Sequence, residues 1–162
     1  MREASILLKL TVHTRTFLRY WLPALVWTAA VLFGSSGFFS AQNTGSPLEG
    51  LLTALFGQIS PRHLAIVHFF IRKLAHLTEY GILAWLLFRA FRHAPNGWQW
   101  RWAEFALAGV LLIAVADELH QHFVPSRTGS PVDVIIDLCG AMLALMLVRG
   151  FANARRSATS AS

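Results

Sequence analysis

A stretch of polar residues between two apolar runs holds side chains that could do chemistry. It extends from Asp117 to Asp133 and contains carboxylates, an amide, imidazoles and one arginine, among them Glu118, Gln121 and Arg127. An Asp near the centre of a membrane helix costs roughly 2.5–3.5 kcal/mol on insertion scales, so charged residues next to such helices are functional candidates by default. The stretch therefore predicts a site.

A second polar set interrupts an earlier apolar segment. Lys73, His76 and Tyr80 are spaced i, i+3 and i+7, and Glu79 lies three residues beyond His76. This spacing places the four side chains along one stripe of a helix. Because a polar stripe on a membrane-spanning helix avoids lipid, we expect it to face protein or water.

The polar residues of three segments are expected to meet at one depth. Asp133 and Asp137, four residues apart, share a face within the first two turns of the last apolar helix. With a rise of about 1.5 Å per residue, Lys73, Asp117, Glu118 and Asp137 all fall within roughly 10–12 Å of the outer membrane surface. The sequence thus predicts one site built by three helices.

The first functional hypothesis is a site for an anionic, lipid-linked or envelope ligand that is open to the outer leaflet. The fork of Arg127 suits a phosphate or carboxylate, with assistance from Lys73. If a reaction follows, carboxylates and an imidazole can transfer protons. The catalytic candidates are His76, Glu79 and Glu118. The ligand-binding candidates are Lys73, Tyr80, Asp117, Gln121, Arg127, Asp133 and Asp137.

Other interpretations of the same residues stay open. One is a buried ion network that holds the helices together, in which Lys73 and Arg127 neutralise Asp117 and Glu118 while Asp133 merely caps its helix. A second is a proton relay, since titratable chains inside membrane helices mark such paths. A third is a scaffold without chemistry. Membrane lipids are expected partners under every hypothesis.

A metal site is a further alternative, although the preferred prediction includes neither a metal nor a cofactor. Zinc accepts nitrogen and oxygen ligands. The ligands would come from His76, Glu79, Glu118 and one of His120 and His122. The two latter histidines are otherwise interpreted as interfacial. Arg72 is interpreted as snorkelling to the membrane surface.

The composition is that of an integral membrane protein with one small domain. Of 162 residues, 55% are hydrophobic and 14% are charged, and the mean hydropathy is +0.50. Soluble domains average about 25% charged residues. The net charge of +6 reflects basic residues that flank apolar segments, which indicates membrane topology and no nucleic-acid partner. The single Cys139 permits no internal disulfide and is interpreted as a packing residue.

The elements expected to position the site are four membrane-spanning helices in an all-α bundle, with a short interfacial helix between the first two. The helices are predicted at residues 17–39, 61–91, 102–122 and 131–151. Residues 1–16 form an N-terminal cytoplasmic segment, residues 17–151 the membrane domain, and residues 152–162 a disordered tail. A signal peptide is an alternative for the N-terminal segment. Ser-Pro pairs at 46, 60 and 130 predict helix starts.

The orientation follows from the distribution of Lys and Arg. The N-terminal segment, the turn between the second and third helices and the C-terminal end carry more of these residues than the opposite loops. By the positive-inside rule, both termini are predicted in the cytoplasm. The polar site then lies on the outer side.

The joint motif resembles that of the VanZ-like family, small bacterial membrane proteins named after the accessory gene of a glycopeptide-resistance cluster. It comprises Lys73-x-x-His76-x-x-Glu79-Tyr80, Asp117-Glu118-x-x-Gln121-x-Phe123-x-Pro125-x-Arg127 and Ser130-x-x-Asp133-x-x-x-Asp137-x-x-Gly140. The resemblance covers about residues 20–150, and Asp137 stands where Asn is usual in the family. It implies a location in the bacterial inner membrane and a link to the cell envelope and to teicoplanin susceptibility, and it supplies no established reaction.

Overall fold

Four long helices make up most of the chain in this computed structural model, which describes residues 2–35, 49–55, 57–93, 98–124 and 129–160, and only the backbone of residues 2–13. They are α1 (Arg2–Ser35), α3 (Pro61–Arg92), α4 (Trp100–His122) and α5 (Pro131–Ser160). Residues 49–55 are also helical. The fold is all-α, as predicted.

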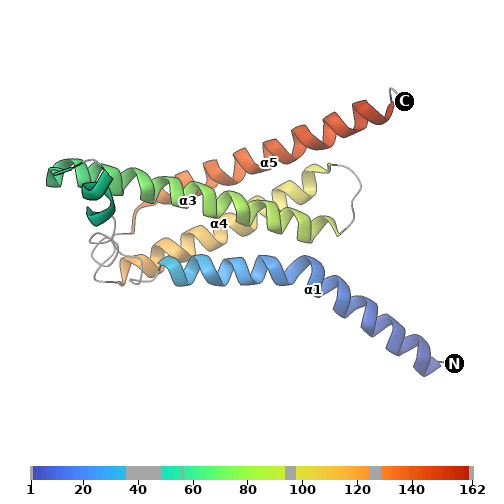
Figure 1. The fold of residues 1–162 in the computed structure, drawn as a ribbon. Helices are drawn as coiled ribbons and strands as arrows, with labels where there is room; N and C mark the ends of the chain where they lie inside the picture. The colour runs from blue at the N-terminus through green and yellow to red at the C-terminus, as the bar shows by residue number, and fades with distance from the viewer. Residues whose placement is uncertain (1, 36–48, 56, 94–97, 125–128, 161–162) are drawn as a thin grey trace.

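Helix α3 is the centre of the bundle, because it packs against each of the other three long helices. Helix α4 also contacts α1 and α5. Figure 1 shows that α1 and α4 end at the same end of the bundle where α3 and α5 begin. We call this the site end. Both chain termini lie at the opposite end (Figure 1).

The distribution of side chains is inverted relative to a soluble protein. Large apolar side chains are exposed on every long helix, for example Phe33, Phe70, Leu112 and Met146, while several carboxylates are buried. Such an apolar exterior suits lipid. Helix α1 from Thr14 to Ser35 and helix α5 are long and apolar enough to cross a membrane.

Helix boundaries differ from the predicted ranges mainly at the two ends of the chain. Helices α3 and α4 lie within two residues of 61–91 and 102–122. Helix α1 begins at Arg2, so it runs through the segment predicted to precede it. Helix α5 continues to Ser160, and the part of the predicted disordered tail that the structure describes is helical. The first Ser-Pro pair lies outside the described residues.

The start of α3 follows the predicted cap. The Ser60 hydroxyl accepts a hydrogen bond from the backbone N–H of His63 at 3.4 Å, and Pro61 occupies the first helical position. This satisfies one of the backbone donors that a helix start leaves unpaired.

Cys139, interpreted from the sequence as a packing residue, is instead exposed on α5. Its side chain therefore lies on the outer surface of the bundle.

Small residues let α3 and α5 approach closely beside the polar residues. A Cβ added to Gly140 of α5 would overlap the backbone carbonyl of Leu77 on α3, and one added to Gly81 of α3 would lie 3.2 Å from the Gly140 carbonyl oxygen. Such small-residue contacts are typical of helix pairs in membranes. The close approach brings residues 76 and 137 within hydrogen-bond distance.

Substitution of Gly140 by Ala is expected to separate α3 from α5 and to lower the free energy of unfolding by about 1–3 kcal/mol, as overpacking does. Thermal unfolding of the purified protein in detergent measures this change. The control is Gly150→Ala on the same helix, where an added Cβ meets nothing within 4 Å. Equal melting temperatures for the two variants would contradict the close-packing role of Gly140.

Candidate functional site

Three polar side chains from three helices meet inside the bundle. His76 of α3, Glu118 of α4 and Asp137 of α5 are all buried, and one potential ligand atom from each lies within 4.8 Å of the others. We call these residues the central cluster. His76 Nδ1 and Asp137 Oδ1 are 3.0 Å apart and form a hydrogen-bonded ion pair when the imidazole is protonated. The predicted convergence of three helices is therefore present.

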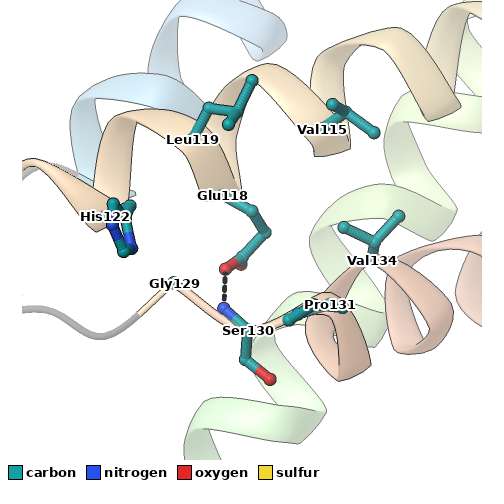
Figure 2. A pocket seen from close by; sticks show the side chains of 8 residues that line it. All are labelled: Val115, Glu118, Leu119, His122, Gly129, Ser130, Pro131 and Val134. Carbon is teal, nitrogen blue, oxygen red and sulfur yellow. Dashed lines mark hydrogen bonds between the residues drawn. The ribbon is translucent and has the colours of Figure 1, made fainter.

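The backbone fixes one side of the cluster. Glu118 Oε2 accepts a 2.6 Å hydrogen bond from the backbone N–H of Ser130, just before α5 begins. Figure 2 shows the Glu118 side chain reaching from α4 toward this nitrogen. The Ser130 hydroxyl accepts from the N–H of Val132 at 3.2 Å, which caps the start of α5. The Ser-Pro helix start thus also orients Glu118.

A neutral hydrogen-bond network surrounds Asp117. Its Oδ1 accepts from the hydroxyl of Ser35 on α1, and its Oδ2 accepts from the Tyr80 hydroxyl and from Gln121 Nε2, each at 3.1 Å. Gln121 Nε2 also donates to Ser35 Oγ at 3.0 Å. The hypothesis that Lys73 neutralises Asp117 is therefore wrong, because neutral donors on three helices satisfy this carboxylate.

A charged group lies nearer the surface. Asp133 is 1% exposed and pairs with Lys73 and, at 3.4 Å, with Arg72. Arg72 Nη2 also donates to Gln121 Oε1 at 3.0 Å. Asp133 therefore forms ion pairs with two cations, which goes beyond the predicted capping of α5. Arg72, predicted to reach for the membrane surface, is bound to Asp133 and Gln121. We call Arg72, Lys73 and Asp133 the charged group.

Negative charge exceeds positive charge among the described residues of the site. Arg72 and Lys73 are the cations, and both are bound to Asp133. The carboxylates are Asp117, Glu118, Asp133 and Asp137. Glu118 Oε1 and Asp137 Oδ2 are buried without a hydrogen-bond partner among the described residues. An unsatisfied buried polar atom costs roughly 1–3 kcal/mol, and more when charged. The central cluster is therefore suited to a cation or a hydrogen-bond donor.

Some predicted site residues lie apart from the central cluster, and one is not among the residues that the structure describes. Glu79 is partly buried on α3, where its backbone carbonyl accepts from Trp27 Nε1 at 2.9 Å, and it is not one of the three clustered residues. Arg127 lies outside the described residues. His120 and His122 are exposed, as the interfacial interpretation expects. The described geometry thus leaves the roles of Glu79 and Arg127 as predictions.

Two residues of the site were not predicted. Ser35 ends α1 and bonds Asp117, although the sequence shows only a small polar residue after an apolar run. Arg72 precedes Lys73 in a segment where both lie near a membrane surface. The Gly-Ser-Ser-Gly run at 34–37 was the available signal for Ser35, since small polar residues at a helix end permit close contacts.

An apolar groove runs beside Glu118 between α4 and α5. Its volume is about 320 Å³. Figure 2 shows Val115 and Leu119 on the α4 side, Pro131 and Val134 on the α5 side, and Glu118 between them. Its other lining residues are His122, Gly129 and Ser130. Because Val115 and Leu119 are largely exposed on the apolar exterior, the groove connects the lipid-facing surface with the central cluster.

The bundle has an apolar exterior, buried carboxylates and two helices that are long and apolar enough to span a membrane. These features define a helical membrane protein with an internal polar site. The VanZ/LLP1 family model matches residues 20–152, which include the residues of the central cluster and of the charged group. The chain belongs to this family, and the resemblance drawn from the motif is confirmed. Neither a comparison with curated proteins nor one with solved structures gave a match.

Proposed function

We propose that the protein binds an anionic, lipid-linked ligand of the cell envelope, with the apolar chain in the α4–α5 groove and the headgroup at the charged group, beside the central cluster. The observation that carries the proposal is the groove itself, because its walls are apolar and its inner side ends on Glu118. Ligand sites are typically apolar pockets with a few convergent polar groups. This combination fits an amphipathic ligand better than a water-soluble one.

The charged group supplies the positive side of the proposed headgroup site. The side chains of Arg72 and Lys73 are 33% and 20% exposed, whereas that of Asp133 is 1% exposed. Asp133 thus anchors both cations while their outer surfaces stay accessible. An arginine fork binds phosphate oxygens through paired N–H groups. Arg127 remains a predicted third cation of this site.

The proposed location is the bacterial inner membrane, with both termini in the cytoplasm and the site end toward the outer leaflet. Support comes from the opposite end, where Arg89 donates to the Arg19 carbonyl at 2.9 Å and Arg149 lies 4.6 Å from the Trp100 ring. Tryptophans are typical of either membrane–water interface, and an excess of arginines is typical of the cytoplasmic one. An outer-leaflet envelope ligand would link the site to teicoplanin susceptibility.

Substitution of Val134 by Trp is expected to fill the groove and to reduce retained lipid-linked ligand by roughly 10- to 100-fold, since overpacking costs about 1–3 kcal/mol. Native mass spectrometry of the purified protein measures the retained phosphorylated lipid. The matched control is Ile135→Trp, because Ile135 is the next residue and is 60% exposed outside the groove. Equal retention by both variants would contradict ligand binding in the groove.

A second candidate function is acid–base catalysis on the same ligand. The observation that favours it is the His76–Asp137 pair, because a carboxylate bonded to an imidazole orients the ring for proton transfer. Glu118 completes the central cluster with this pair and also lines the groove. The pair would then act as base and Glu118 as acid, or in the reverse order.

A further inference from the structure

We propose that the central cluster binds a divalent transition-metal ion through His76, Glu118 and Asp137. The three residues offer one imidazole nitrogen and two carboxylates, and their potential ligand atoms lie within 4.8 Å of one another. Ligand atoms around tetrahedral zinc are roughly 3.4 Å apart, because each lies about 2.1 Å from the ion. Small side-chain rotations thus suffice to close the cluster around an ion.

The hydrogen bonds leave a free oxygen on each carboxylate. Glu118 Oε2 is held by the Ser130 N–H and Asp137 Oδ1 by His76, while Glu118 Oε1 and Asp137 Oδ2 are buried without a partner among the described residues. Metal-binding side chains commonly use one polar atom for the ion and the other for an orienting hydrogen bond. Glu118 has this arrangement, whereas an ion between His76 and Asp137 would replace the hydrogen bond that joins them. This pattern is independent of the proximity of the three residues.

The charge of the surroundings also favours a cation. Both cations of the charged group are bound to Asp133, and Asp117 accepts from three neutral donors. Two carboxylates therefore face His76 with no further cation among the described residues of the site. A divalent ion would balance their charge.

The ligand set identifies the class of metal. Imidazole favours zinc, copper, iron or nickel over magnesium and calcium, which prefer oxygen ligands. Three protein ligands leave a fourth position open, as in catalytic zinc sites. Glu118 lines the groove, so the ion would add positive charge beside the expected position of the anionic headgroup. This last step rests on the proposed function, whereas metal binding itself does not.

The test is metal analysis of the full-length protein, purified in detergent, stripped with a chelator and reloaded with Zn²⁺. We expect one zinc ion per chain in the wild type, measured by inductively coupled plasma mass spectrometry. Asp137→Asn and Glu118→Gln keep the side-chain shapes and should weaken binding by at least about 100-fold. His120→Ala is the control, since this histidine is exposed on α4 outside the groove and the central cluster, and it should keep the zinc.

Two results would overturn the metal site. One is a stripped wild type that takes up neither Zn²⁺ nor Co²⁺, the latter followed by its visible absorption. The other is zinc lost in His120→Ala but kept in Asp137→Asn, which would place the ion at an exposed histidine. The Co²⁺ spectrum uses only wild type and does not depend on variant folding.

Native mass spectrometry of the same samples separates the metal proposal from the ligand proposal. Phosphorylated lipid retained without zinc in the Zn²⁺-reloaded wild type would overturn the metal site alone. Zinc bound with no retained lipid would support the metal site and count against the lipid-linked ligand.

Discussion

Replacement of Lys73 by Met is expected to lower the free energy of unfolding by about 3 kcal/mol, because it removes a cation from buried Asp133. Breaking a buried ion pair on one side costs about 3–5 kcal/mol, since the remaining charge is left uncompensated. Asp133 is 1% exposed, and Arg72 at 3.4 Å would remain as its only described cation. The expected loss therefore lies at the lower end of that range.

Chemical unfolding in detergent micelles measures this effect, with Arg62→Met as the control. Arg62 is exposed in the first turn of the same helix, where surface substitutions usually change stability by less than about 0.5 kcal/mol. The double variant Lys73→Met/Asp133→Leu should recover most of the loss, because it removes both charges. A single variant as stable as the Arg62→Met control would show that the pair is not structural.

The depth of the site in the membrane could be predicted from the sequence. The hydrogen-bond and ion-pair partners of its side chains could not. Helix rise places Lys73, Asp117 and Asp137 at a common depth, and the structure brings their helices together there. Depth alone does not give the rotation of each helix about its axis. That rotation directs Asp117 toward Tyr80 and Ser35, so its partners are two hydroxyls and the Gln121 amide instead of the predicted lysine.

The contacts of Arg72 also could not be predicted from its depth in the membrane. Its position near a membrane surface is compatible with snorkelling, and one-third exposure of its side chain agrees with that view. The guanidinium is nevertheless bound, because α4 ends and α5 begins beside it and present Gln121 and Asp133. Only the packing of three helices reveals this contact.

Helix α5 extends into the predicted disordered tail because of the helix propensity of the tail residues. The predicted disordered tail rests on its Ser and Ala content, yet Ala and Arg have high helix propensity and residues 152–156 are Ala, Asn, Ala, Arg and Arg. Once α5 is formed, each further residue adds a hydrogen bond without a new nucleation step. The helix therefore continues to Ser160 with exposed side chains.

Replacement of Glu118 by Gln is expected to abolish function while the fold and the retained lipid remain. If Glu118 transfers a proton, its loss should lower turnover by about 10²- to 10⁴-fold. The amide oxygen of Gln can still accept from the Ser130 N–H, so the loop before α5 should keep its position. The measurement is the teicoplanin susceptibility of a sensitive bacterial host that expresses either protein, together with native mass spectrometry of each.

The matched control is Glu104→Gln, an exposed acid on the same helix, which should behave as wild type. Full function of Glu118→Gln would contradict a chemical role for this carboxylate, and a lower melting temperature as the only change would favour a structural network. Zinc measured in the same samples separates the two chemical roles. Function lost together with zinc assigns Glu118 to the metal site, because the ion would then be the missing group. Function lost with zinc retained assigns Glu118 to proton transfer and removes it from the metal ligands.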